Sequence, residues 1–207
     1  MTRPQSIEMT HPLPTPYRRT LLYLAQRLGE VPNTRLHKIV YLIDLEYFRR
    51  YGRTLTGAPW VRHNYGPMTK ALLPALADMA GHELNQRAKT TLSDRTVKLV
   101  EPGPAPRYQP DLGLAEQEVA EFILELTHRL TDRQVLDLAY ATTPMRSILR
   151  REAILGRKLI DEPLDFAAAP VLPDRDEPDP DGYAAFKLSE VQALRGVRAR
   201  LLDDFAG

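Results

Sequence analysis

Apolar residues recur at helical spacing along most of the chain, and this pattern predicts a mainly helical protein. The first helix is expected at residues 16–28, because Thr15 can cap its start, a proline suits its first position and Gly29 can end it. A second helix is expected at residues 33–51. Its apolar stripe is wider than one helix face, so this helix should lie at the centre of the fold. The stripe comprises Leu36, Ile39, Val40, Leu42, Ile43, Leu45, Tyr47, Phe48 and Tyr51.

Shorter elements are expected in the middle of the chain. Residues 60–65 predict a short strand, and Gly66–Pro67 is expected to open a third helix. Pro74 is expected to bend that helix, because a proline cannot donate a hydrogen bond to the carbonyl group four residues back. Residues 82–101 alternate between apolar and polar side chains around a turn, which predicts a β-hairpin.

The second half of the chain returns to helical spacing. Residues 119–130 form one apolar face, Thr131 with Gln134 makes a capping box for the next helix, and Thr143–Pro144 opens another. The predicted fold class is therefore α+β and predominantly helical. It is a single helical domain with a short strand and a wing-like β-hairpin between its N-terminal and C-terminal helices.

Composition divides the chain into four expected parts. Residues 1–15 hold three prolines and few large apolar groups, which predicts a mobile leader before a domain at 16–160. Residues 161–186 are expected to form a proline-rich acidic linker, because the stretch DRDEPDPD carries five acids against one arginine. A C-terminal helix is expected at 187–207.

The overall charge and the motif content favour binding over catalysis. The net charge is +1, so binding to nucleic acid or to a membrane would need a local patch. The chain has no cysteine, its five histidines lack the spacing of metal ligands, and it has neither a nucleophile elbow nor a phosphate-binding glycine loop. We therefore expect no catalytic residue, no metal and no cofactor. No apolar run approaches a membrane span, which favours a cytoplasmic protein without a membrane partner.

The main candidate site is the short segment that holds the only tryptophan. Aromatic and arginine side chains are the types on which binding energy concentrates. The candidate partner-binding residues are Trp60, Arg62, His63, Asn64 and Tyr65. The alternative is structural: Trp60 and Tyr65 would close the core, while strand alternation would place Arg62 and Asn64 outside.

Two charged residues lie within the wide apolar helix. Lys38 is either a buried functional cation or, as is commoner, a side chain that follows the core and places its ammonium group in water. Asp44 is expected to pair with a cation on a neighbouring element, which would be a structural role.

A second candidate surface is basic. Residues 17–53 carry eight lysines and arginines against three acids, and a basic helix pair followed by a strand, a helix and a hairpin is similar to winged-helix DNA binders. The candidate nucleic-acid contacts are Arg18, Arg19, Arg35, Arg49, Arg50 and Arg53. The corresponding recognition helix has one lysine and little that reads base edges, so an ordinary solvated face is the alternative.

A longer pattern joins several of these features. A lysine-containing apolar helix is followed by Tyr-Gly, then Leu-Thr-Gly, then a short strand that ends in Tyr-Gly-Pro. The residues that form the pattern are Lys38, Tyr41, Tyr51, Gly52, Leu55, Thr56, Gly57, Tyr65, Gly66 and Pro67. This pattern resembles the Panacea domain, also called the antitoxin SocA-like domain. Residues 130–149 resemble a later block of that family, although Tyr140 and Met145 stand where many members have histidine and tryptophan.

The resemblance, over roughly residues 17–155, implies an antitoxin that neutralises a partner toxin by protein–protein contact and is not an enzyme. One family member is an adaptor that delivers its toxin to a Clp-type protease, so an adaptor with residues 161–181 as a tether is one alternative. The other is an autoregulator that binds its own promoter DNA. The expected partners are thus a cognate toxin and, in the alternatives, a Clp-type protease or DNA. An acidic linker would add electrostatic contact to a basic toxin.

Overall fold

The computed structural model describes residues 15–90, 94 and 96–168. In these residues, helices predominate and the strands are short, which confirms the predicted α+β class. The elements are α1 (Pro16–Leu28), β1 (Val31–Pro32), α2 (Asn33–Tyr51), β2 (Val61–His63), β3 (Gly66–Met68), α3 (Leu72–Met79), β4 (Leu84–Thr90), β5 (Thr96–Pro102), α4 (Leu114–Thr127), α5 (Asp132–Ala141), α6 (Thr143–Leu155) and the 3-10 turn η1 (Phe166–Ala168).

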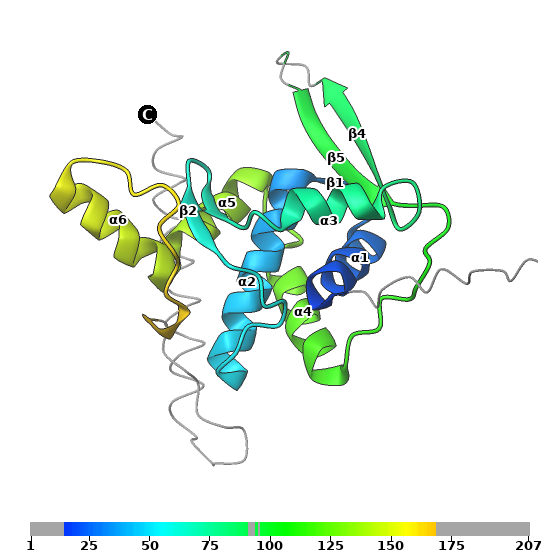
Figure 1. The fold of residues 1–207 in the computed structure, drawn as a ribbon, viewed down its shortest axis with the longest axis horizontal. Coiled ribbons are helices and arrows are strands. Elements are labelled where there is room, and N and C mark those ends of the chain that lie inside the picture. The colour runs from blue at the N-terminus through cyan, green and yellow to red at the C-terminus, as the bar shows by residue number, and fades with distance from the viewer. Residues whose placement is uncertain (1–14, 91–93, 95, 169–207) are drawn as a thin grey trace, which may run out of the picture.

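Helix α2 is the centre of the fold, as its wide apolar stripe predicts. Every side chain from Leu36 to Tyr47 is buried, on all sides of the helix. Helices α1, α4 and α5 pack around it, and β3 contacts it as well (Figure 1). A helix buried on all sides also buries its charged residues, and each of these then needs a partner inside the protein.

The ends of the first two helices confirm their predicted boundaries. The Thr15 hydroxyl group accepts a hydrogen bond from the backbone N–H of Arg18 at 3.3 Å, and Pro16 occupies the first position of α1. The N–H of Gly29 returns to the helix at the carbonyl group of Ala25, and Gly52 ends α2 in the same manner.

The predicted β-hairpin projects from the helical body (Figure 1). Strands β4 and β5 pair antiparallel from Leu84↔Pro102 to Thr90↔Thr96. Strand β1 was not predicted, because two residues are too few to show alternation; it pairs with β5 at Val31↔Val100 and completes a three-stranded sheet in the order β1-β5-β4. The buried side chains of this pair fasten the hairpin to the core.

The predicted start of the third helix is wrong, because Gly66–Pro67 belongs to a second hairpin. Strand β3 pairs antiparallel with β2, and α3 begins only at Leu72. Gly66 has φ +83°, a left-handed conformation that suits a tight turn and not a helix. Pro74 lies in the first turn of α3, where the backbone N–H groups have no partner within the helix, so it removes no helical hydrogen bond.

The predicted helix starts in the second half are confirmed. The hydroxyl group of Thr131 accepts a hydrogen bond from the N–H of Gln134, and the Gln134 side chain accepts one from the N–H of Thr131 at 2.9 Å. Thr143 and Pro144 open α6, which buries Met145.

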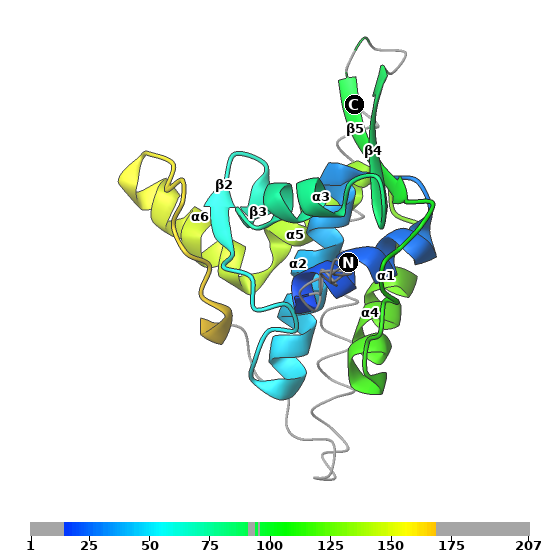
Figure 2. The ribbon, with the colours of Figure 1, turned by 45° about the vertical axis from the view of Figure 1, so that its right-hand side comes forward.

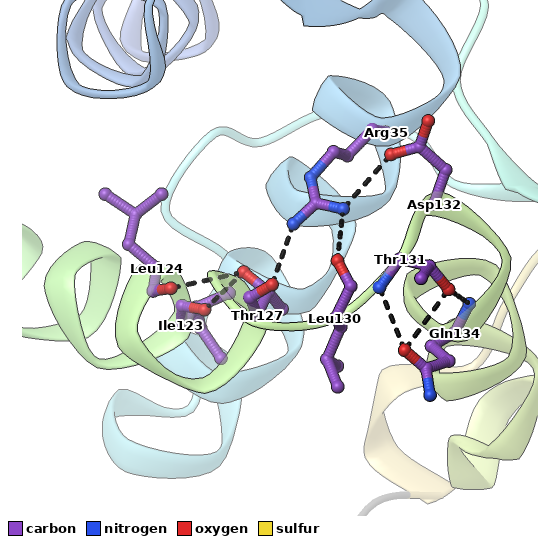
Figure 3. Close-up of polar contacts among 8 residues, drawn as sticks. All are labelled: Arg35, Ile123, Leu124, Thr127, Leu130, Thr131, Asp132 and Gln134. Carbon is purple, nitrogen blue, oxygen red and sulfur yellow. Dashed lines mark hydrogen bonds and ion pairs between the residues drawn. The ribbon is translucent and has the colours of Figure 1, made fainter.

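Arg35, near the start of α2, holds the corner between α4 and α5 (Figure 3). Its guanidinium group donates hydrogen bonds to the backbone carbonyl groups of Thr127 and Leu130, both at 2.7 Å, and to the Asp132 carboxylate at 3.1 Å. Both carbonyl groups lie at or beyond the end of α4, where the helix no longer supplies its regular donors. Arg35 therefore ties the second helical half to the central helix.

Replacing Arg35 by alanine should lower the free energy of unfolding by about 2–3 kcal/mol, because two partly buried carbonyl groups lose a charged donor. The matched control is Arg133→Ala on α5, whose side chain is 74% exposed and pairs with Asp137. In this control the free energy of unfolding should fall by less than about 0.5 kcal/mol. Urea unfolding followed by circular dichroism measures both variants, and equal losses would contradict the role of Arg35.

Candidate partner-binding site

The candidate segment 60–65 forms β2 and the turn that leads into β3. This β2–β3 hairpin lies between α6 and α2 in Figure 2, and β3 contacts both α2 and α5. The hairpin therefore has several helices against which its side chains can be held.

Asp44 of α2 fixes the base of the hairpin. Its fully buried carboxylate accepts hydrogen bonds from the Trp60 indole N–H at 2.7 Å, from the backbone N–H of Thr56 at 2.8 Å and from the Thr56 hydroxyl group. These donors are all neutral, so the expectation that Asp44 pairs with a cation is wrong. Burial raises the pKa of the Asp44 carboxyl, and the hydrogen bonds from Thr56 and Trp60 oppose that rise. Removing any one donor would weaken the hydrogen bonding of a fully buried carboxylate.

Trp60 closes the core. Its side chain is 4% exposed, and its ring lies 5.1 Å from the ring of His37 and 5.3 Å from that of Tyr41, measured between centroids. A tryptophan suits this place because it combines a large apolar surface with one N–H donor for the carboxylate. The structural interpretation is confirmed, and Trp60 does not contribute to an exposed contact surface.

Lys38 and His37 reach from α2 to the end of β3. The Lys38 ammonium group donates to the carbonyl group of Pro67, and its side chain is buried, so this cation lies in the core and not in water. Burial lowers the pKa of Lys38 to about 7. The His37 Nε2 atom accepts a hydrogen bond from the N–H of Thr69 at 3.1 Å. Burial and the nearby Lys38 and His63 lower the pKa of His37 to about 3, which keeps this ring neutral.

Strand alternation was expected to place the Arg62 side chain on the solvent side of the strand, and this expectation is wrong. Its side chain is 4% exposed. The guanidinium group donates to both carboxylate oxygens of Glu152 on α6, at 3.0 and 3.1 Å, and also to the carbonyl group of His63. Strand alternation failed here because α6 supplies a carboxylate on the side of the strand that was taken to face solvent. The sequence gives no local signal for this pair, which is 90 residues apart.

Residues 161–168, where the acidic linker was expected to begin, pack against the domain. The backbone groups of Arg62 exchange hydrogen bonds with Asp161 and Glu162, each at 2.8 Å, and the Leu164 N–H donates to the Trp60 carbonyl group at 2.9 Å. Phe166 is buried with its ring edge-on to Tyr41, 5.7 Å between centroids. The rest of the expected linker, the C-terminal helix and nearly all of the leader lie outside the described residues.

The exposed end of the hairpin is its turn. Tyr65 is 69% exposed, which excludes its alternative role in closing the core, and Asn64 is also exposed, while His63 is half-buried. Tyr140 of α5 supports this turn, because its hydroxyl group donates to the Asn64 carbonyl group at 3.0 Å. A Cβ atom at Gly66 would lie 3.1 Å from the Tyr140 ring. Of the five candidate residues, the turn residues His63, Asn64 and Tyr65 are thus the ones whose side chains reach the surface.

The six arginines of the second candidate surface are not brought together. They lie near the start of α1, near the start of α2 and around the end of α2, and α2 alone is about 28 Å long. Partners within the protein occupy them: Arg18 pairs with Asp78, Arg19 with the Asp111 carbonyl group, Arg35 with the α4–α5 corner, Arg49 and Arg50 with Glu46, and Arg53 with the Tyr47 hydroxyl group. This arrangement lacks the clustered free cations that phosphate contacts need.

The ionisable groups around the hairpin serve the fold. Lys38, His37, Asp44 and Arg62 all bind groups of the protein itself. In the part of the chain that the structure describes, no cluster of three or more His, Asp or Glu side chains could hold a metal ion. No helix of that part has the length and apolar character needed to cross a membrane.

The antitoxin SocA-like, Panacea domain family matches residues 36–144, from α2 to the start of α6. The match covers just over half of the chain, and the chain belongs to this family. It is an antitoxin family and not an enzyme family, and an antitoxin implies a cognate toxin as partner. No curated protein and no solved structure matches the chain.

Stability should rise with pH above about 7 because of Lys38. Its pKa in the unfolded chain is the ordinary 10.5, so between the two values the unfolded state holds a proton that the folded state has lost. From pH 7 to pH 9 the free energy of unfolding should therefore gain on the order of 2 kcal/mol. Below pH 7 the lysine is protonated in both states and adds no pH dependence. The Lys38→Met variant should lack this rise in the free energy of unfolding, as measured by urea unfolding at each pH. The same pH dependence in the variant and the original protein would refute the role of Lys38.

Gly66→Ala should destabilise the protein more than Gly57→Ala. Both glycines have positive φ, but an added Cβ meets Tyr140 at Gly66 and nothing within 4 Å at Gly57. In each variant, backbone strain should lower the free energy of unfolding by about 1 kcal/mol. At Gly66 the clash with Tyr140 should lower it by at least a further ~1 kcal/mol. In a Tyr140→Ala background the difference should vanish. Thermal and urea unfolding test this, and a difference that persists without the ring would exclude the contact as its cause.

Proposed function

We propose that this chain neutralises its toxin by binding it directly, with the β2–β3 turn, His63–Tyr65, as a principal contact. The observation that carries the proposal is the contrast within one hairpin. Trp60 and Arg62 are each 4% exposed and hydrogen-bonded inside the protein, whereas Tyr65 is 69% exposed at the tip. A large aromatic side chain exposed on an anchored turn is suited to recognition.

The anchoring supports this function through the entropy of binding. A contact loop that is already fixed loses little conformational freedom when a partner binds, so more of the interaction energy appears as affinity. Here Tyr140 holds the Asn64 carbonyl group, and Lys38 holds that of Pro67, on either side of Tyr65. Family membership supports a toxin as the partner. In the proposed mode of action, the anchored turn covers part of the toxin, and no chemical step is needed.

Tyr65→Ala should weaken toxin binding by at least about tenfold, since buried aromatic anchors at interfaces contribute at least 1–2 kcal/mol. The free energy of unfolding of this variant should hardly change, because the Tyr65 side chain is exposed. The matched control is Leu73→Ala on α3, 65% exposed and outside the turn, which should bind normally. The partner tested in growth-rescue and calorimetric assays is the product of the neighbouring gene, as the candidate toxin. Full neutralisation of the toxin by each of the variants His63→Ala, Asn64→Ala and Tyr65→Ala would exclude the turn as a principal toxin contact.

Purified components separate direct inhibition from adaptor function. Direct binding predicts that an equimolar amount of this protein blocks the toxin when no protease is present. Inhibition that requires a Clp-type protease and is accompanied by loss of the toxin would instead establish an adaptor and contradict direct inhibition.

A further inference from the structure

Helix α6 carries a set of cations that the proposed toxin contact does not use. Its exposed basic residues, with those of the loop that follows, are Arg146, Arg150, Arg151, Arg157 and Lys158. Arg151 pairs with Glu162 at 2.7 Å, and the one acid of the helix, Glu152, is committed to Arg62. Among the described residues the other four make no ion pair, although Lys158 lies near enough to Glu152 to help lower the pKa of that carboxyl. We call Arg146, Arg150, Arg157 and Lys158 the cationic face.

Two of these four cations lie on one exposed side of α6, and the other two follow directly after the end of the helix. Arg146 and Arg150 are four residues apart and therefore lie one above the other on the same helix face, next to Ile154, which is 84% exposed. The helix points away from the rest of the body (Figure 1). Like charges at this spacing repel each other, so an anionic segment lying along the face would remove a repulsion as well as add attractions.

The chain itself contains a segment of matching charge. Residues 174–181 carry five acids against one arginine. The last described element, η1, contacts α6, so the chain leaves the described part beside this helix. The five residues between Ala168 and Asp174 span up to about 20 Å when extended, which equals the approximate length of α6. A tether this short gives a local concentration in the millimolar range, which favours contact within one chain over contact with another molecule.

We propose that the acidic segment, residues 174–181, binds the cationic face of α6 in the same chain. The attraction consists of exposed ion pairs, so it is weak per pair and sensitive to salt. An acidic external partner could reach this face only by displacing the segment. The inference goes beyond toxin binding by the β2–β3 turn and does not depend on it.

Carbodiimide coupling tests the proposal on the full-length protein, because this reagent joins an amine to a carboxylate in direct contact. At low protein concentration and low salt, the acidic segment should couple to Lys158 at least roughly fivefold more than to Lys89, an exposed lysine on β4 far from α6, because ion pairing enriches that contact. The yield at Lys158 should not depend on protein concentration. Mass spectrometry of the digested monomer identifies both products.

Charge reversal supplies the control for specificity. Arg146→Glu with Arg150→Glu should reduce the Lys158 product by roughly fivefold, because each exposed ion pair changes an equilibrium only a few-fold. Adding Asp176→Arg and Asp179→Arg should restore it. Equal yields at Lys158 and Lys89, no change on charge reversal, or a yield that grows with protein concentration would each overturn the proposal, and the last would assign the contact to a second copy.

Discussion

A buried carboxylate needs hydrogen-bond donors, and most of this structure around the candidate site can be understood from how Asp44 obtains them. The Trp60 indole and both donors of Thr56 converge on its two oxygens, so the segment that leaves α2 must return to α2. The strand that follows Trp60 is thereby placed at a fixed position on the central helix. No cation neutralises Asp44 in the described part of the chain, which makes the three neutral donors more costly to lose.

The remaining anchors continue from that point along the hairpin. Glu152 holds Arg62 from α6, Tyr140 holds the turn from α5, and Lys38 holds β3 from α2. Three helices thus hold one short hairpin, and two of them, α5 and α6, do so through residues that lie 76 and 90 positions from their partners in the hairpin. The aromatic and charged residues that make the segment conspicuous in the sequence are mostly used for this purpose, and the side chains of the turn are the ones left at the surface. The contact with a toxin that we propose would gain from such an arrangement, because the turn is ordered before its partner arrives.

Local signals predicted much of the fold, and long-range partners account for what they missed. The ends of α1 and α2, the capping box of α5 and the projecting hairpin follow from a few neighbouring residues each, and the sequence alone located them. The inward direction of Arg62 depends on Glu152, so it could not be inferred from the strand itself. Arg35 looked like a phosphate ligand for the same reason, since the carbonyl groups it binds lie more than 90 residues away. For the candidate segment, the structural alternative was right for Trp60, but it placed Tyr65 in the core and Arg62 outside, the reverse of what the structure shows.

The most direct test of the central claim is amide hydrogen exchange on Trp60→Phe, combined with toxin affinity. This change keeps an aromatic ring in the core and removes only the indole N–H that binds Asp44. If that hydrogen bond orders the contact surface, amides of β2 and β3 should exchange faster while those of α4 and α5 keep their protection, and toxin binding should weaken although Tyr65 is intact. Unaltered protection of β2 and β3, or full affinity despite its loss, would contradict the account.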